Sequence, residues 1–515
     1  MIVDYLQPGD LVGCRYRLVQ AQRHPNIAPT AHSQIRQERL RSHRAAMLAT
    51  FPDRRALGDT VVFRRFDVGA SYADPEQGWL DTLEALAHAP TIITEAMLEL
   101  HEPTAMGSTW YIAVDALVRH EDRYIPIIIS NHRVARLHKE QQVWSCATSR
   151  LGLGSWQQVP FKIKNHAYDS FALALATRAL ATLDLDAAFG GLVGQDSSRA
   201  YFVPVEHVER GLDNALQTPV PTQALRIKEC GHCRYSSWCT AELEGRDDVS
   251  LFIRGQQASQ LKAEGIHTVD DLIHAGRGEQ SQMAQAWRAN IALLRRDAPV
   301  AQLRRDIEID VDVEAYLDSG AYLWGTYDGQ EYRPFATWGE LGGAAEAANF
   351  ADFWRWLQAQ QAHAKAQGKS FGVYCYSAHG ENHWLRFSAR RFAGKFAGVP
   401  SEEEIAAFIA SDAWIDVYAA VEQQLCSPFS LGLKAVAHEA GFYWQTPDID
   451  GEASVEYFQR AQTQLQARAD LLSYNGDDCR ATAVVRSWLA TGTPELPRLA
   501  DITPALIDTA GASHT

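Results

Sequence analysis

The sequence predicts an α/β protein with several domains. Its 515 residues are long enough for about three or four domains. An apolar content of 46% and 14 tryptophans can fill more than one hydrophobic core. A compact group of cysteines closes one segment near residue 240, and a pattern of strands followed by helices begins near residue 301. We therefore expect a first domain, a helical connector, a second α/β domain and a flexible tail, over residues 1–245, 246–300, 301–505 and 506–515.

Charge and composition narrow the class of protein. The formal net charge of −15 argues against a protein that simply coats nucleic acid through a basic surface. No run of about 18 uncharged apolar residues occurs, so we expect no membrane-spanning helix and no membrane partner. The opening segment MIVDYLQPGDLVGCRYR lacks the layout of a signal peptide. Unpaired cysteines at metal-ligand spacing are typical of reducing compartments, which predicts a cytoplasmic protein.

Positive charge is concentrated near the start of the chain. Residues 1–66 contain eleven arginines and five acidic residues, and they include the run RQERLRSHR. Arginine clusters suit phosphate contacts, which makes these side chains candidates for nucleic-acid binding. A solvated helical face explains the same run equally well. The candidates are Arg36, Arg39, Arg41 and Arg44.

Four cysteines have the spacing of metal ligands. Cys14 stands near the start, and Cys230, Cys233 and Cys239 follow as C-x2-C-x5-C. Four thiolates can hold an iron–sulfur cluster or a zinc ion. A self-contained zinc knuckle gathers its ligands within about 15–30 residues, whereas this set would join the two ends of one domain. We expect the other cysteines to be ordinary buried thiols, namely Cys146, Cys375, Cys426 and Cys479.

This cysteine layout resembles that of the iron–sulfur nucleases of the RecB type, which include the AddB-like helicase-nucleases and RecB-like CRISPR-associated nucleases. In that family one cysteine precedes the nuclease core and three follow it, as Cys14 and the later trio do here. The resemblance implies a [4Fe–4S] cluster, with structural zinc as the alternative.

The nuclease motifs of that family are eroded in this chain. RecB-type nucleases have a PD-(D/E)XK core, in which one strand delivers an aspartate, the next carries Asp-x-Lys and a helix supplies Gln-x-x-x-Tyr. The segment YIAVDALVR places Asp115 in the first position, but Ile128 and Ser130 stand where Asp-x-Lys is expected. Ala172 and Ala176 replace the glutamine and the tyrosine. The resemblance therefore implies a degenerate nuclease domain that binds nucleic acid without cutting it.

Two alternatives remain for Asp115. As a weak metal ligand it would need substitutes for the missing groups, and His132, Arg133 or Glu95 could supply them. As a structural residue it would bind no metal, because a lone carboxylate holds Mg²⁺ poorly.

The connector contains LKAEGIHTVDDL, in which Gly265 makes a turn and Thr268 caps a helix. This segment resembles a helix-hairpin-helix unit, whose turn amides contact a phosphate. Gly265 is thus a candidate for nucleic-acid binding, although a plain pair of packed helices fits the same residues. We expect residues 277–300 to be a helical linker.

Three acidic residues alternate with apolar ones at the start of the second domain. Asp310, Asp312 and Glu314 should project from one face of a strand, while Ile309 and Val311 project from the other. Carboxylates crowded on one strand face repel each other unless a cation lies between them. This pattern predicts a divalent metal site.

The same strand resembles the first motif of the DEDD exonucleases, which have a ribonuclease H-like fold. The resemblance assigns Asp312 and Glu314 to the Asp-x-Glu pair, with Asp310 as a flanking candidate. Glu381 follows a buried strand, in the place of the second acidic motif, and Asp416 matches more weakly an aspartate at the end of a strand in the YprB-like branch.

The last motif lies in LLSYNGDDCRATAVVRSWL, where Tyr474 and Asp478 stand one helical turn apart. The resemblance implies that Asp478 completes the metal shell and that Tyr474 orients the attacking water. We expect the neighbouring Asp477 to face outward. The implied cofactors are Mg²⁺ or Mn²⁺, in a two-ion site.

The arrangement as a whole resembles a bacterial family of RecB-like nucleases that join an iron–sulfur RecB domain, a helix-hairpin-helix segment and a YprB-like ribonuclease H domain. It implies an exonuclease of DNA repair or processing that acts on single strands or ends. An inactive nucleic-acid-binding adaptor and an exoribonuclease acting on RNA are the alternatives. The chain has no G-x4-G-K-[ST] motif, so any unwinding would need a separate helicase partner.

Overall fold

The computed structural model describes residues 5–53, 55–57, 60–104, 107, 109–194, 198–316, 319–445 and 453–503. The chain forms a mixed α/β structure with two compact units, Met1–Ala263 and Glu264–Thr515. The division falls inside the segment 246–300, for which the sequence predicts a connector. The predicted tail over 506–515 lies outside the described residues.

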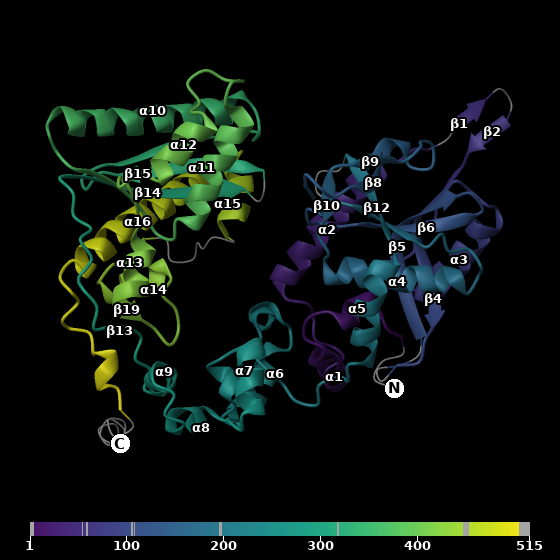
Figure 1. Ribbon diagram of the computed structural model, residues 1–515, viewed down its shortest axis with the longest axis horizontal. Helices are drawn as coiled ribbons and strands as arrows, with labels where there is room; N and C mark the ends of the chain where they lie inside the picture. The colour runs from purple at the N-terminus through teal and green to yellow at the C-terminus, as the bar shows by residue number, and fades with distance from the viewer. Residues whose placement is uncertain are drawn as a thin grey trace. The chain divides into compact units, whose positions relative to one another are not determined.

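A large mixed sheet forms the centre of the first unit (Figure 1). Its strands follow the order β3-β4-β5-β6-β11-β12-β8-β9. The run β4-β5-β6 is an antiparallel meander, and β11 joins β6 in parallel. The strand bounds are Arg65–Asp67 (β3), Ile92–His101 (β4), Thr109–His120 (β5), Arg123–Ile129 (β6), Val143–Ala147 (β8), Gln157–Val159 (β9), Phe189–Val193 (β11) and Arg199–Pro204 (β12). Two smaller pairs are β1 (Arg55–Leu57) with β2 (Thr60–Phe63), and β7 (Ala135–Leu137) with β10 (Phe161–Ile163).

Helices cover both faces of this sheet. Helix α4 (Ala167–Ala181) lies across β4, β5 and β6 and buries a continuous apolar surface there (Figure 1). On the other face, the end of α2 (Ala31–Leu48) packs against apolar residues of β6, β11 and β12. Strand β6 contributes alternate residues to both cores, which explains why its sequence is apolar throughout. Two further helices of this unit are α3 (Pro75–Ala87) and α5 (Glu206–Gln217).

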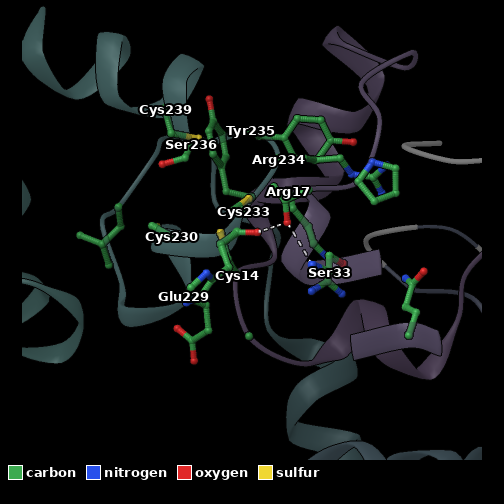
Figure 2. A pocket seen from close by; sticks show the side chains of 17 residues that line it. Cys14, Arg17, Ser33, Glu229, Cys230, Cys233, Arg234, Tyr235, Ser236 and Cys239 are labelled. Atoms are coloured by element: carbon green, nitrogen blue, oxygen red, sulfur yellow. Dashed lines mark hydrogen bonds between the residues drawn. The ribbon is translucent and has the colours of Figure 1, made fainter. Parts of the chain in front are cut away.

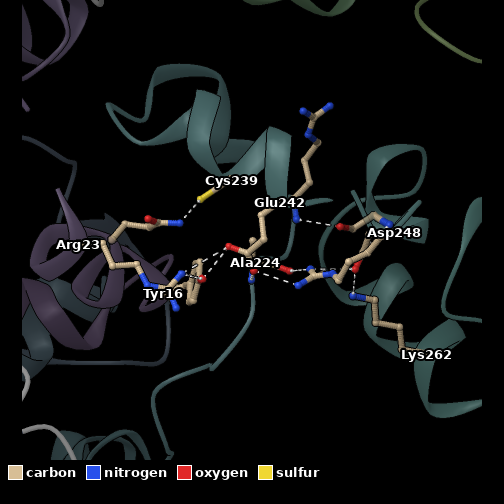
Figure 3. A network of polar contacts seen from close by, with 11 residues as sticks. Tyr16, Arg23, Ala224, Cys239, Glu242, Asp248 and Lys262 are labelled. Carbon is tan, nitrogen blue, oxygen red and sulfur yellow. Dashed lines mark hydrogen bonds and ion pairs between the residues drawn. The ribbon is translucent and has the colours of Figure 1, made fainter. Parts of the chain in front are cut away.

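The beginning and end of the first unit are held together by a polar network (Figure 3). The Tyr16 hydroxyl donates to a carboxylate oxygen of Glu242 at 2.7 Å, and Glu242 also pairs with Arg246 at 2.9 Å. Asp248 continues the chain of contacts to Lys262 at 2.8 Å. The network thus joins α1 (Tyr16–Arg23) to α6 (Ser236–Glu244), η4 (Val249–Leu251) and α7 (Gly255–Ala263).

The second unit is built on a sheet in the order β16-β15-β14-β17-β18 (Figure 1). Strands β14, β15 and β16 form an antiparallel meander, and β17 and β18 continue the sheet in parallel with β14. The alternating acidic segment therefore forms one strand of a hairpin, β14 with β15. The bounds are Ile307–Tyr316 (β14), Gly320–Tyr327 (β15), Tyr332–Ala336 (β16), Phe371–Cys375 (β17) and Trp414–Asp416 (β18).

Each face of this second sheet has its own helical layer. Ile309 and Val311 of β14 pack against α10 (Ala344–Ala366), α11 (His379–Phe392) and α12 (Glu402–Ile409). The long helix α16 (Leu465–Leu489) crosses the opposite face of the sheet, together with α15 (Ala453–Ala461). The acidic side of β14 therefore faces α16. Helices α13 (Val417–Gln424) and α14 (Leu433–Glu439) pack against α16.

The segment 277–300 is helical only in part, contrary to the prediction. Helix α8 (Val269–His274) is followed by α9 (Glu279–Arg288), and the chain then becomes extended. Leu294–Arg295 (β13) pairs with Leu425–Cys426 (β19). Leu294 is fully buried in that pairing, so a contact distant in sequence overrides the local helical preference.

Candidate active site and candidate metal centre

Three carboxylates from the second unit form a group with the geometry of a metal site. Asp312 and Glu314 lie two residues apart on β14 and therefore project from the same face. Helix α16 brings Asp478 onto that face. One carboxylate oxygen from each residue lies within 4.8 Å of the others, and this is the one such group of three found among the described residues.

Burial and mutual repulsion make this group unfavourable without a cation. Burial, followed by the charges of Asp478, Glu314 and Glu381, raises the pKa of Asp312 well above its usual value. Burial, and then the charge of Asp478, raises the pKa of Glu314 to about 8. Burial raises the pKa of Asp478 to about 6. A divalent cation would relieve this repulsion, and carboxylate oxygens are its preferred ligands.

Each of the three carboxylates accepts a hydrogen bond from a separate segment. The Asn475 amide donates to Asp312 Oδ2 at 2.6 Å, and the Trp444 indole N–H donates to Asp478 Oδ1 at 2.8 Å. The Ser454 hydroxyl is hydrogen-bonded to Glu314. Sequence reasoning missed these donors. Asn475 stands beside Tyr474 in the last motif, which offered a signal, whereas nothing local pointed to the other two.

We expect the Trp444→Phe change to weaken metal binding while preserving the packing of the ring. Partners that orient ligating groups typically contribute about 10–100-fold in metal affinity. Titration calorimetry with Mn²⁺ should show a loss of at least about ten-fold relative to wild type. The Trp384→Phe change, on α11, is the matched control and should leave the affinity unchanged. Equal affinities in all three proteins would show that the Trp444 hydrogen bond does not orient Asp478.

Tyr474 lies beside this group, as the last motif predicts. Its side chain is buried and hydrogen-bonded to the Asp478 carboxylate, one turn further along α16. Burial, with the nearby acids, raises the pKa of its hydroxyl, so the group stays protonated and can donate. The Lys434 ammonium lies 5.2 Å from the centroid of the Tyr474 ring.

Glu381 and Asp416 lie near the group in different roles. Glu381 is buried in the first turn of α11, and burial raises its pKa to about 8. Its charge acts on Asp312, although it is not one of the three residues within 4.8 Å. Asp416 ends β18, and its carboxylate accepts the backbone N–H groups of Ser377 and Ala378 at 3.0 Å and of Tyr418 at 2.9 Å. Asp416 therefore fixes the turn that leads into α11.

Asp310, the flanking candidate, has its own cation. It is fully buried, and its two oxygens accept hydrogen bonds from Arg486 Nε at 2.8 Å and Nη2 at 3.0 Å. Arg486 also contacts Glu308. Burial nevertheless raises the pKa of Asp310 to about 6. This aspartate thus belongs to a buried ion pair, separate from the group of three.

We expect Arg486→Met to destabilise the second unit strongly. The change leaves Asp310 buried without its cation, and breaking a buried pair from one side costs about 3–5 kcal/mol. Urea unfolding, followed by tryptophan fluorescence, should show the loss. Arg390→Met is the control, because its pair with Glu402 is exposed and worth about 0–1 kcal/mol. Similar losses in the two variants would contradict this assignment.

Asp477 does not face outward as predicted. It is 1% exposed, accepts the Gln445 backbone N–H at 2.8 Å and pairs with Arg480 at 3.1 Å. The loop after α14 covers the side of α16 that bears Asp477. The sequence of α16 alone gives no sign that this side is buried.

The four predicted ligand cysteines of the first unit surround one cavity (Figure 2). Cys14 precedes α1, Cys230 lies in η3 (Lys228–His232), Cys233 follows it, and Cys239 lies in α6. The cavity has a volume of about 410 Å³. Burial raises the pKa of Cys239 to about 11, and the charges of the other three thiolates add to that shift. The other four cysteines are buried singly, as predicted.

Two of the four sulfur atoms accept hydrogen bonds. The donors are the Ile227 backbone N–H, 3.3 Å from Cys230 Sγ, and the Gln20 amide Nε2, 3.5 Å from Cys239 Sγ.

Among the described residues of the first unit, Asp115 forms contacts with the backbone of a neighbouring strand and with an arginine. It lies within β5, where its Oδ2 atom accepts the Ile129 backbone N–H at 2.6 Å and its Oδ1 atom pairs with Arg44 Nε at 3.2 Å. Burial raises its pKa to about 6. The positions of the missing motifs are occupied by core side chains, Ile128, Ala172 and Ala176. His132 stacks on His166, with ring centroids 4.3 Å apart.

The predicted nucleic-acid contacts are only partly described. The side chains of Arg36 and Arg39 lie outside the described part of α2. Arg41 is exposed and pairs with Glu38 at 3.3 Å, whereas Arg44 points to Asp115 and is not a free surface cation.

The predicted phosphate-binding turn of the connector contains its own anion. Gly265 has a φ of 88°, as a turn glycine should. The amides of His267 and Thr268, however, donate to the Asp271 carboxylate at 3.0 and 2.9 Å. These two amides therefore form a helix cap, as the plain packing alternative expects.

Comparison with known proteins agrees with this geometry in the second unit. The model of the RNase_H superfamily matches residues 310–490, which begin on β14, end just after α16 and include all three clustered carboxylates. The chain therefore contains a C-terminal ribonuclease H-like domain. A domain of this superfamily suggests a nuclease-type function and, with it, binding to nucleic acid. Neither the curated proteins nor the solved structures yielded a match. None of the described helices combines the length and apolar character needed to cross a bilayer.

Proposed function

We propose that this protein is a metal-dependent exonuclease that hydrolyses phosphodiester bonds of DNA with its C-terminal domain. The observation that carries the proposal is the clustering of half-buried Asp312 with buried Glu314 and Asp478 inside a ribonuclease H-like domain. These residues, with Glu381 beside them, would hold Mg²⁺ or Mn²⁺. Bound there, the ions supply a Lewis acid that activates water and neutralises charge on the phosphate.

The chain's own residues prepare that site. Asn475, Ser454 and Trp444 each hold one carboxylate, and Tyr474 is also hydrogen-bonded to that of Asp478. The protonated Tyr474 hydroxyl would orient the attacking water. Glu314 and Asp478 are buried, and electrostatic interactions gain strength in such surroundings.

We propose that the first unit is a RecB-like domain that guides the strand without cutting it. The order of strands and helix around Asp115 supports the resemblance, while the core residues at the lost motif positions support the lack of catalysis. Arg44 pairs with Asp115 and supplies a positive charge there. In an active nuclease of this family, a metal ion would provide that charge.

The cysteines of the first unit would hold a [4Fe–4S] cluster with a structural role. Four thiols around one cavity are the donor set that such a cluster takes, and a structural zinc ion is the alternative for the same four ligands. The cluster would join the first helix to the end of the unit, alongside the polar network of Tyr16 and Glu242.

The test of the proposed activity uses anaerobically purified full-length protein. Single-stranded DNA and RNA, labelled at the 5′ or the 3′ end, are incubated with Mn²⁺ and either wild type or Asp312→Ala. Progressive shortening of DNA by wild type alone is the expected result. Binding without cleavage by wild type would favour the adaptor. Shortening of RNA in preference to DNA would favour the exoribonuclease, and cleavage that survives in Asp312→Ala would contradict the assigned site.

A further inference from the structure

An exposed tyrosine stands next to the metal-site carboxylates. Tyr443 follows α14 and is 69% exposed, while the adjacent Trp444 is buried and donates its indole N–H to Asp478 Oδ1 at 2.8 Å. Tyr443 is therefore one residue away from a group that touches the candidate active site. Such a large exposed ring contributes nothing to the core of this unit.

Among the described residues, the Tyr443 ring has one aromatic partner. It stacks on His438, with ring centroids 5.1 Å apart and planes inclined by 28°. This contact favours one orientation of the ring, while most of its surface is exposed. A fixed aromatic face loses little conformational entropy when a flat ligand stacks on it.

A positive charge lies close to the residues that contact the carboxylates, on the helix that precedes Tyr443. The Lys434 ammonium, on α14, lies 5.8 Å from the Trp444 ring centroid and 5.2 Å from that of Tyr474. Its charge lowers the pKa of Asp478 against the larger effect of burial. An ammonium at the edge of an acidic site attracts a phosphate that the carboxylates alone would repel.

We infer that Tyr443 and Lys434 form a nucleotide subsite for an unpaired strand end, with a base stacked on the open face of Tyr443 and a phosphate beside Lys434. The inference rests on the proposed function, since it places substrate at the same carboxylates. Stacking on a protein ring requires an open base face, and an unpaired strand end can offer such faces more freely than bases stacked inside a duplex. An aromatic platform and a neighbouring cation are the two elements such binding uses.

The subsite is tested by binding, independently of cleavage. Single-stranded oligonucleotides with 2-aminopurine at the 3′ end, the 5′ end or an internal position are titrated with full-length protein. Ca²⁺ replaces Mn²⁺ because it takes the same oxygen ligands. Wild type should quench the fluorescence of one terminal probe. Tyr443→Ala should remove the quenching and weaken binding about ten-fold, which lies within the range for one stacked base.

Conservative variants separate stacking from packing. Tyr443→Phe should behave as wild type, and Tyr443→Leu, which keeps apolar bulk without an aromatic face, should behave as Tyr443→Ala. Lys434→Ala should reduce the slope of log affinity against log salt by about 0.7, the value for one phosphate contact on a single strand. A duplex with blunt ends should not respond to either change.

The outcomes separate this inference from the proposed activity. Unchanged quenching and affinity in Tyr443→Ala would overturn the subsite even if wild type cleaves DNA. Loss of quenching in that variant, in a protein that cuts nothing, would support the subsite and overturn the nuclease. Equal effects on duplex and single strand would also overturn the subsite, because the ring would then not select an unpaired strand end.

Discussion

Replacing Asp312 by Asn should abolish cleavage and, in metal-free buffer, stabilise the protein. The change removes an acid from a group in which burial raises the pKa of each member, so that its ionisation costs free energy when no metal is bound. One relieved charge is worth about 1 kcal/mol, which corresponds to a melting temperature about 2–4 °C higher for a domain of this size. Cleavage should fall by about 10²–10³-fold or more, the effect of losing one electrostatic group in such a site.

The sign of the stability change should reverse when metal is added. Wild type should gain about 2.7 kcal/mol at a Mn²⁺ concentration 100 times its Kd, while Asp312→Asn should gain much less. Differential scanning fluorimetry measures the melting temperatures of wild type and Asp312→Asn without Mn²⁺ and with it. The exposed Asp352, which pairs with Arg355 on α10, supplies the control Asp352→Asn. A variant less stable than wild type in metal-free buffer would show that Asp312 is a structural residue.

Sequence patterns identified the parts of this site that are local. Two-residue alternation on β14 and the one-turn spacing of Tyr474 and Asp478 follow from strand and helix geometry, so they could be read without a structure. The ribonuclease H-like match over 310–490 agrees with that interpretation. The prediction that the acids of β14 and the pair on α16 meet in space came from the resemblance to a known family. The residues themselves did not indicate it.

The remaining features depend on contacts between residues far apart in sequence. Asp310 has the same local pattern as Asp312, yet Arg486 neutralises it from 176 residues away. The sequence predicts an exposed Asp477 because it gives no sign that the loop bearing Gln445 covers α16. Trp444 has no sequence signal at all, since its role is defined only by the carboxylate that its ring reaches. Arg44, expected to contact phosphate, instead pairs with Asp115 of β5.

Replacing Cys233 by Ser should remove the metal centre and loosen both ends of the first unit. Its sulfur lies with those of Cys14, Cys230 and Cys239 around one cavity, so its loss leaves three thiols that must hold any metal. The free energy of binding a structural metal contributes directly to the free energy of folding. It is on the order of 10 kcal/mol in small zinc domains. Here the sheet has its own core, so the effect should concentrate in α1, η3 and α6, beside the half-buried cysteines.

Iron and sulfide analysis, the visible spectrum and limited proteolysis measure that result. Wild type should contain about four irons per chain, from the composition of the [4Fe–4S] cluster. Cys233→Ser should lose the iron and be cut near the cysteine-bearing segments, while the β4–β6 region resists. Cys146→Ser is the control, because this buried thiol belongs to the same unit and lies apart from the cavity.

One zinc per chain in place of iron would show that the four thiols hold a structural zinc site and not the cluster. Retention of iron in Cys233→Ser, with unchanged proteolysis, would show that the thiol is not a ligand. The polar network of Tyr16, Glu242 and Asp248 would then be what joins the ends of the unit.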